Sequence, residues 1–499
     1  MFFFCAAAPQ AVPWLLLTIL TTYGCGLFLE KAEGKGAKRL ALAACLAVNL
    51  GLLALFRYFP VWEDLLNGWY GGGIRRVKLD LAAAWGLAAP LGISFYTLQA
   101  VGYLLDVAGK KYPAEKNLLH FAVFVSFFPN LSSGPIERAG HFLPQLRGLA
   151  RSSRRQLWDY DRMAVGLIHI LWGFFLKMVL ADRAAVLVDH LFGLYENTDS
   201  FTMLMAALFY SVQIFCDFAS YSCIAVGAAQ LMGFSLIRNF RQPYLAAGFR
   251  DFWSRWHISL SGWLRDYVYI PLGGNRKGVL RRYGNILITF LVSGLWHGGA
   301  PHFLVWGLLH GLCQAAEDLA VRACRRCAGA AGGLRGNRGR GEEKRQEKCE
   351  GGVGEPGGNL TARPVIKKIL QLLSRILYAA FTFAAVTVLW IFFRADSLEM
   401  ALVCLENLFT RWQGFLAADQ LIFVMGLDKT EFLIAAAGIA LLLLSELVSE
   451  WTKKPQAEWI YASPLPVRFL ICLFLMGAVF VVGKYGVGFD ASNFIYMGF

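Results

Sequence analysis

One histidine lies deep inside an apolar stretch of the sequence. His310 is near the middle of residues 301–315, which directly follow the sequence Leu-Trp-His-Gly at 295–298. An imidazole in hydrocarbon is costly, so it seldom occurs there without a partner or a chemical task. A free histidine has a pKa of roughly 6.5, so much of it is neutral at pH 7 and can accept a proton from a hydroxyl group. His310 is therefore a candidate general base.

The position of His310 favours one reaction in particular. Pro301 is suited to a first helical turn, and nine residues at about 1.5 Å each place His310 roughly 13 Å into a hydrocarbon layer about 30 Å thick. A base at that depth is suited to moving an acyl group from a donor on one side to a hydroxyl acceptor on the other. The sequence has no Gly-x-Ser-x-Gly elbow and no evident covalent nucleophile, which favours direct transfer in a ternary complex.

Further polar residues accompany His310. His257 follows Trp256 in the segment 249–271, whose large rings recur at helical spacing, and taken alone it is more typical of an interfacial hydrogen-bonding residue than of a catalyst. His297 falls, together with His302, at the mouth of the apolar run, where water reaches both side chains. A buried histidine satisfied by another helix is the structural alternative for His310 itself.

A carboxylate lies in another apolar stretch. Asp217 follows Gln213 within residues 200–233. A buried carboxylate could orient an imidazole or bind a substrate hydroxyl, and it could equally be a structural partner for a neighbouring helix. We also expect no metal site, because Cys324 and Cys327 form a single CxxC with no second pair nearby.

The composition indicates a membrane protein. Of the 499 residues, 57% are apolar and only 16% charged, more apolar surface than a soluble fold can bury. The net charge of +14 lies in short linkers and one insert, a pattern of topology signals, so no nucleic-acid partner is expected. We predict an all-α polytopic protein with about ten spans and shorter re-entrant or interfacial helices. The spans are expected at 11–30, 38–57, 79–106, 158–188, 200–233, 284–300, 301–321, 365–393, 430–448 and 465–483, and the shorter pieces at 117–131, 249–273 and 400–426.

Charge also predicts orientation and domains. If 117–131 and 249–273 enter and leave on the cytoplasmic side, every basic linker lies inside. Residues 322–365 are basic and rich in glycine with few aliphatic residues, so a disordered cytoplasmic insert is expected there. It divides the membrane domain into residues 1–321, which carry the candidate site, and residues 366–499.

Several long motifs resemble those of one family. The blocks lie, in order, at residues 133–146, 250–276, 295–298, 307–311, 392–397 and 488–496. They are similar to the signature blocks of membrane-bound O-acyltransferases, above all of the bacterial branch that O-acetylates alginate, with the D-alanyl transferases of teichoic acid as more distant relatives.

The resemblance implies a fold and a division of roles. It implies about 10 or 11 transmembrane helices, with tilted helices around a thin central plate and a tunnel. His310 takes the position of the family's catalytic histidine, and His257 that of its second functional histidine. Other substrate or tunnel candidates are His297, Trp296, Asp217, Gln213, Trp256, Arg255 and Asn275.

The resemblance also implies substrates and partners. A cytoplasmic acyl thioester, such as acetyl-CoA or an acyl carrier, acts as donor without a bound cofactor, and the acceptor approaches from outside. A separate extracytoplasmic transferase would then acetylate the polysaccharide, and the protein would lie in the bacterial cytoplasmic membrane. Three features depart from the family pattern: the first helix that is usual in this branch is expected to precede the start at Met1, Cys223 stands where a second Asp is usual, and the 322–365 insert has no counterpart.

The sequence leaves other functions open. The same chemistry could transfer D-alanine to teichoic acid, or an acyl chain to a lipid or protein, and tunnel width would separate a long chain from acetyl. A transporter could use His310 and Asp217 as a proton relay, although no inverted repeat is evident. The chain could also be a scaffold for an export complex.

Overall fold

The computed structural model describes residues 9–58, 61, 90–149, 151–152, 158–342, 362–412, 426–485 and 494. In these ranges every regular element is a helix, which confirms the predicted all-α class. Seven helices are long and apolar enough to cross a membrane, so the chain is a multi-pass membrane protein. The start of the predicted span 79–106 and most of the motif at 488–496 lie outside the described residues.

The described residues form a succession of helices joined by connections of different lengths. In chain order they are α2 (Val12–Lys31), α3 (Lys35–Arg57), α6 (Ile93–Ala108), α7 (Leu118–Val125), α8 (Ala139–Leu149), α10 (Tyr160–Phe174), α11 (Asp182–Gly193), α12 (Ser200–Leu231), α13 (Phe249–Arg255), α14 (Ile258–Leu264), α15 (Val279–His297), α16 (Pro301–Glu342), α17 (Ala362–Arg394), α18 (Leu398–Thr410), α20 (Lys429–Thr452), α21 (Gln456–Ala462) and α22 (Leu465–Val482). Two π-helical segments, η3 (Phe175–Ala181) and η6 (Arg265–Tyr269), continue α10 and α14.

The seven candidate spans are fewer than the ten that the sequence predicted. Helix α6 has only 16 residues within the described part of the chain. Helix α15 covers most of the predicted span 284–300 and α16 begins at Pro301 as predicted, but neither is among the seven. Arginines in the first turn of α15 and the histidines of both helices dilute their apolar character.

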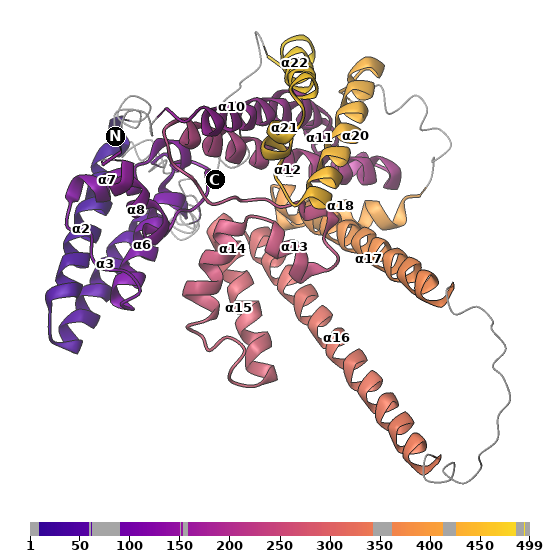
Figure 1. The fold of residues 1–499 in the computed structure, drawn as a ribbon, viewed down its shortest axis with the longest axis horizontal. Coiled ribbons are helices and arrows are strands. Elements are labelled where there is room, and N and C mark those ends of the chain that lie inside the picture. The colour runs from indigo at the N-terminus through magenta and orange to yellow at the C-terminus, as the bar shows by residue number, and fades with distance from the viewer. Residues whose placement is uncertain are drawn as a thin grey trace, which may run out of the picture.

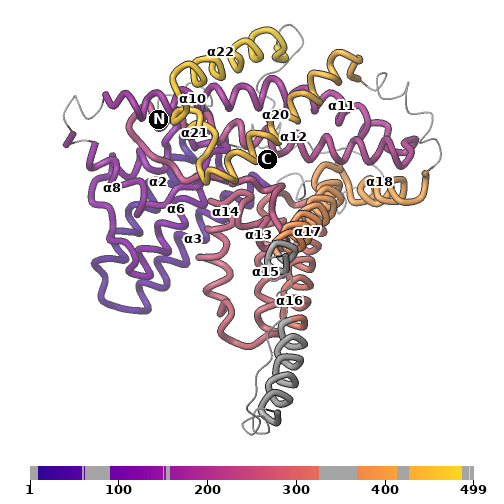
Figure 2. Tube along the Cα trace, turned by 45° about the vertical axis from the view of Figure 1, so that its right-hand side comes forward, coloured from indigo at the N-terminus to yellow at the C-terminus, as the bar shows by residue number. Residues whose placement is uncertain are grey.

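The N-terminal helices form one group and the central helices another (Figure 1). Helices α2, α3, α6, α7 and α8 pack together, and α10 and α11 lie along α12. Helices α13 and α14 lie near the centre, above α15, in both views (Figures 1 and 2), and α15 contacts the N-terminal group, where Phe95 of α6 packs on Trp296 at 5.4 Å. The candidate site is built where these short helices meet α15, α16 and α17.

Two glycines set the close contact between α15 and α16. A Cβ on Gly307 would lie 2.4 Å from the Phe290 carbonyl oxygen, and one on Gly294 would lie 2.3 Å from the Phe303 carbonyl oxygen. Any larger residue at either position would push the two backbones apart, because real Cβ atoms do not approach that closely. The close contact fixes the position of His310, one turn after Gly307, relative to α15.

Helix α16 continues beyond the expected start of the insert. The sequence predicted disorder over 322–365, whereas α16 runs to Glu342 and extends away from the other helices (Figure 1). A shortage of aliphatic residues excludes a packed core but does not exclude a single helix. Residues 343–361 lie outside the described part of the chain.

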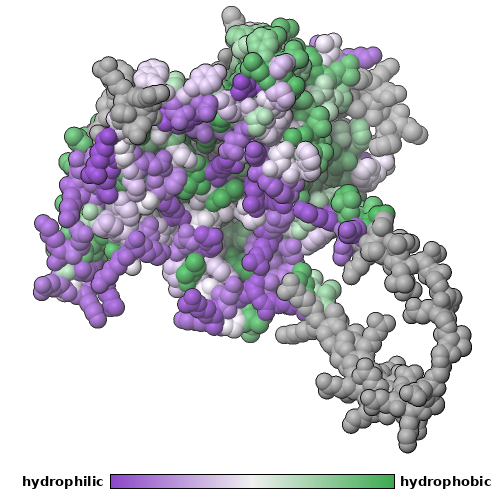
Figure 3. All heavy atoms as spheres, viewed as in Figure 1, coloured by the Kyte–Doolittle hydropathy of each residue, from purple (hydrophilic) through white to green (hydrophobic). Residues whose placement is uncertain are grey.

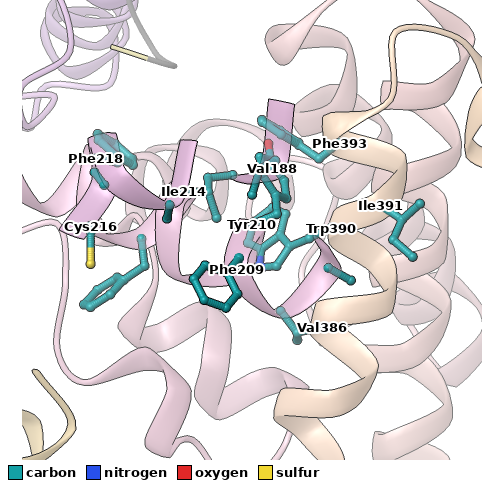
Figure 4. Packing of buried hydrophobic residues seen from close by; sticks show 14 of the residues in the cluster. Val188, Phe209, Tyr210, Ile214, Cys216, Phe218, Val386, Trp390, Ile391 and Phe393 are labelled. Carbon is teal, nitrogen blue, oxygen red and sulfur yellow. The ribbon is translucent and has the colours of Figure 1, made fainter. Parts of the chain in front are cut away.

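The buried core centres on α12 and α17, and the outer faces of α20 and α22 are apolar. Trp390 and Phe393 of α17 share a buried cluster with Tyr210 and Ile214 of α12 (Figure 4). Hydrophobic side chains gather on the exterior over α20 and α22 (Figure 3), where Phe480 is 72% exposed. An exposed apolar helix of this length is typical of a lipid-facing span.

Ion pairs connect linkers that the charge pattern placed on one side. Arg147 pairs with Glu115, which joins the linkers at 109–116 and 147–155. Arg282 Nη2 lies 2.5 Å from Asp318 Oδ1, which joins the start of α15 to the middle of α16. These contacts agree with a common face for the basic linkers.

Candidate functional site

His310 is enclosed by aromatic side chains. It is completely buried on α16, and its Nδ1 accepts a hydrogen bond from the Trp253 Nε1–H at 3.3 Å. Its Nε2 is buried and has no hydrogen-bond partner among the described residues. Six rings surround the imidazole, and we call them the aromatic box: Trp253 and Trp306 with centroids at 5.1 Å, Trp390 at 6.0 Å, Phe252 and Phe290 at 6.4 Å, and Phe249 at 6.5 Å.

Helical spacing explains half of the aromatic box. Phe249, Phe252 and Trp253 are at positions i, i+3 and i+4 of α13, so they share one face of that helix. The sequence predicted one amphipathic helix through this region. The structure instead breaks it after Arg255, and the ring of Trp263 in α14 turns to α6, where its Nε1–H donates to the Leu98 carbonyl at 2.8 Å.

His257 marks the break between α13 and α14. Its backbone is left-handed (φ 42°, ψ 54°), a conformation that residues with a Cβ rarely adopt, and its side chain is 1% exposed. Its ring lies edge-on to Phe218 of α12 at 4.6 Å and to Trp296 of α15 at 5.9 Å.

The connector, residues 239–241, precedes α13 and is hydrogen-bonded to the residues on both sides of this break. The Asn239 carbonyl accepts the Ile258 N–H at 2.9 Å, and the Arg241 N–H donates to the Arg255 carbonyl at 3.0 Å. The buried Asn239 amide also accepts from the Ser259 hydroxyl at 2.6 Å and donates to Ser222 at 3.0 Å. These bonds stabilise the strained backbone of His257 by tying it to α12.

A row of rings links the two candidate catalytic histidines. From His257 the centroids lead to Trp296 (5.9 Å), then His297 (4.8 Å), Trp306 (5.2 Å) and His310 (5.1 Å). The structure therefore brings four of the predicted site residues into one buried cluster.

The predicted exposure of His297 and His302 is wrong. Their exposed fractions are 2% and 4%, respectively, rather than those of side chains at an open mouth. Trp296, Trp306 and Phe393 enclose the His297 ring, which explains its burial.

Three other candidates contact this cluster or its surroundings. Trp256 packs on Trp390 with centroids at 4.9 Å, behind the aromatic box. Arg255 pairs with Asp251 at 2.8 Å and with Glu450 at 3.0 Å, which ties α13 to α20. Asn275 accepts the Tyr269 hydroxyl at 2.6 Å.

Asp217 belongs to a buried ion cluster. Lys177 Nζ lies 2.7 Å from Asp217 Oδ1 and 2.9 Å from Asp182 Oδ1, and all three residues are nearly inaccessible. The Lys177 ammonium also lies 4.0 Å from the Phe494 ring centroid. This favours the structural alternative for Asp217, and Gln213 lies buried one helical turn earlier on α12.

Removing the Lys177 ammonium should reduce the amount of folded protein. Lys177→Met leaves two buried carboxylates without their ammonium, a change that typically costs about 3–5 kcal/mol. The variant should accumulate poorly in membranes, as measured by immunoblot, whereas the exposed Lys429→Met should accumulate normally. Normal accumulation of Lys177→Met would instead restore a substrate role for Asp217.

A cavity of about 640 Å³ lies between α13, α14, η6, α15 and α16. Its volume is typical of small-molecule sites. Arg250, Arg265 and Arg282 line it, together with Asn275. Arg265 and Arg282 are paired with aspartates, whereas the Arg250 side chain has no ion pair within the described ranges.

The cavity reaches the aromatic box. Trp253 and Phe290 line the cavity and also contact His310, so a single layer of side chains separates the imidazole from the cavity. A ligand with an anionic head and a reactive end could therefore present that end to His310. Among the described residues, no group of three His, Cys, Asp or Glu side chains could hold a metal ion.

Sequence reasoning did not assign roles to several of these residues. Trp253 was noted only as part of an aromatic face, and Trp306, Trp390 and Asn239 were not singled out. The tryptophans around the histidine motifs were a usable signal for Trp253 and Trp306. Nothing near these motifs marks Trp390 or Asn239, because their roles depend on contacts with distant segments, such as those of Asn239 with Ser222 of α12 and Ser259 of α14.

Comparisons with known proteins place these motifs in context. A model of the membrane-bound O-acyltransferase family matches residues 86–329. A peptidoglycan O-acetyltransferase of Helicobacter pylori is 30% identical over 432 residues, covering 82% of this chain and 72% of that protein. A probable alginate O-acetylase of Pseudomonas putida is 37% identical over 300 residues, covering 60% of this chain and 59% of the relative.

A teichoic acid D-alanyltransferase of Bacillus subtilis is 31% identical over 235 residues, covering 44% of this chain and 57% of the relative. The chain spans about half the length of the curated alginate relatives that it matches.

Proposed function

Because this chain belongs to the membrane-bound O-acyltransferase family, we propose that it transfers an acetyl group from a cytoplasmic thioester to a hydroxyl acceptor, for O-acetylation of an extracellular or cell-envelope polysaccharide. The observation that carries the proposal is the placement of His310, buried one side chain away from a ligand-sized cavity. A scaffold has no need of that arrangement.

The reaction is a direct acyl transfer with His310 as general base. The acceptor oxygen attacks the thioester carbonyl as the imidazole takes the hydroxyl proton. A carbon–oxygen bond forms and the carbon–sulfur bond breaks. The proton then passes from the imidazolium to the departing thiolate, so the ring returns to its neutral state.

Trp253 has to move during this reaction. An indole N–H can only donate, so its bond to Nδ1 leaves the proton of the neutral ring on Nε2. His310 can accept a proton at Nδ1 only after the indole withdraws. Because Trp253 also lines the cavity, its withdrawal would open the imidazole to a donor that is already bound there.

The arginines indicate the class of donor. A thioester of coenzyme A or of a carrier protein has a phosphate on its pantetheine arm, and arginine is well suited to binding phosphate. Arg250, which has no ion pair among the described residues, is the first candidate for that contact. Asn275 lines the same cavity and could contact the donor's amides.

His257 is proposed as the second functional histidine. It lies at the far end of the row of rings that begins at His310, and the connector at Asn239 fixes its position. It would bind and orient the acceptor, with Trp296 and His297 between the two histidines.

The cellular setting follows from the relatives. These relatives are named for alginate, peptidoglycan and teichoic acid, so the proposed location is the cytoplasmic membrane of a bacterium. An extracytoplasmic transferase is the proposed partner that completes the modification. Transfer of D-alanine to teichoic acid is the second candidate, which the similarity to the Bacillus subtilis protein favours.

Mass spectrometry of envelope glycans tests the proposal. Glycans from cells that have the gene should carry base-labile acetyl esters, and those from cells without it should not. D-alanyl esters in their place would select the second candidate. Identical ester content in both strains would contradict an acyltransferase function.

A further inference from the structure

We propose that the stacked indoles of Trp306 and Trp390 limit the acyl group of the donor to a short, acetyl-sized chain. This inference rests on the proposed acyl transfer at His310. It adds the residues that exclude longer acyl groups.

The two indoles lie beyond His310 when the site is viewed from the cavity. Trp253 and Phe290 line the cavity and contact His310, whereas Trp306 and Trp390 contact His310 but do not line the cavity. A thioester that enters from the cavity brings its carbonyl to His310 first. The carbons beyond the carbonyl would then extend toward the pair of indoles.

The pair forms a closed wall. The Trp306 and Trp390 rings are stacked, with centroids 5.8 Å apart and an interplanar angle of 19°, and their exposed fractions are 1% and 0%. A long acyl chain needs an apolar channel behind the carbonyl. Here the chain would instead meet the two indole rings, which are closely packed against their neighbours.

Neighbouring rings keep the pair from yielding. Trp256 packs on Trp390 at 4.9 Å, and Phe393 contacts Trp306 at 5.1 Å and Trp390 at 5.5 Å. The two indoles also come from different helices, α16 and α17, so neither can swing aside without disturbing the other. Protein interiors are packed like organic crystals, so even one added methylene is felt.

Removing either indole should open space for longer chains. Inverted membrane vesicles that contain the full chain and its natural acceptor would be supplied with labelled acetyl-, butanoyl- or hexanoyl-CoA. The base-labile label on glycan is then counted. We expect the wild type to transfer acetyl, with butanoyl strongly reduced and hexanoyl near background.

In Trp306→Ala and Trp390→Ala the butanoyl-to-acetyl ratio should rise at least tenfold. The ratio is measured within one preparation, so it does not depend on how much protein has folded. Trp172→Ala is the matched control, because this buried indole stacks on Phe175 in α10 and η3 instead. Its ratio should stay at the wild-type value.

If an alanine variant is inactive, the butanoyl-to-acetyl ratio is measured in Trp306→Phe and Trp390→Phe instead. A second assay measures how well hexanoyl-CoA competes with the binding of labelled acetyl-CoA. Hexanoyl-CoA should compete better in the variants than in the wild type. The chain-length proposal alone would be overturned if the wild type transferred hexanoyl as well as acetyl. It would also be overturned if the variants matched the wild type in both the transfer ratio and the competition assay. A wild type that transfers no acyl group from coenzyme A or from an acyl carrier protein would overturn the proposed function as well.

Discussion

Acetyl transfer should fall roughly 10²- to 10⁴-fold when His310 is replaced by alanine, the range typical of a residue that moves a proton in the transition state. The imidazole is the group that the aromatic box surrounds, and the only hydrogen bond that the structure gives it, within the described ranges, comes from Trp253. His310→Gln should lose as much activity, because glutamine can still accept a hydrogen bond from Trp253 but cannot take up the proton. The measurement is the base-labile acetyl content of envelope glycans, divided by the amount of protein in the membrane.

The matched control for this experiment is His302→Ala. His302 is also a buried histidine on α16, and it packs against Phe303 at 4.2 Å rather than in the aromatic box. Its activity per amount of inserted protein should stay close to that of the wild type. Wild-type acetylation by well-inserted His310→Ala and His310→Gln would remove His310 from the reaction.

His257→Ala should reduce acetyl transfer by roughly ten- to hundredfold, less than the full effect of a proton-transfer residue. The smaller effect is expected because His257 lies three rings away from His310 and is proposed to orient the acceptor. The loss should appear mainly as a higher KM for the acceptor, measured by varying glycan in vesicles at saturating donor.

His257→Asn separates the role of the imidazole ring from that of the left-handed backbone at this position. Asparagine tolerates the left-handed conformation at this position better than most residues, so the break between α13 and α14 should persist. This variant should be inserted normally and still lose activity. His169→Ala, which removes a buried histidine bonded to Gln230, gives the cost of removing an imidazole elsewhere in the membrane domain. Equal activity of the His257 and His169 variants per inserted protein would make His257 a structural residue.

Local sequence patterns predicted much of the fold and the site. The apolar runs gave the main helices, and Pro301 after two glycines gave the start of α16. The placement of His310 on a helix that starts at Pro301 also followed from the sequence. These features depend only on neighbours in the sequence, so a single chain was enough to predict them.

Contacts between distant segments could not be predicted in this way. Asp217 is paired with Lys177, which is 40 positions earlier and hidden in an apolar run. The break at His257 depends on bonds from Asn239 and Arg241, and a helical pattern of aromatic residues runs straight through it. The burial of His297 likewise depends on Phe393 of α17.

The layer formed by Trp253 and Phe290 has a consequence for donors waiting in the cavity. Because the reactive imidazole stays behind these rings, a bound thioester meets indole and phenyl groups rather than a base able to activate water. Idle breakdown of the activated donor would therefore be slow between encounters with an acceptor. A protein connecting two compartments could in this way remain loaded without leaking acetate.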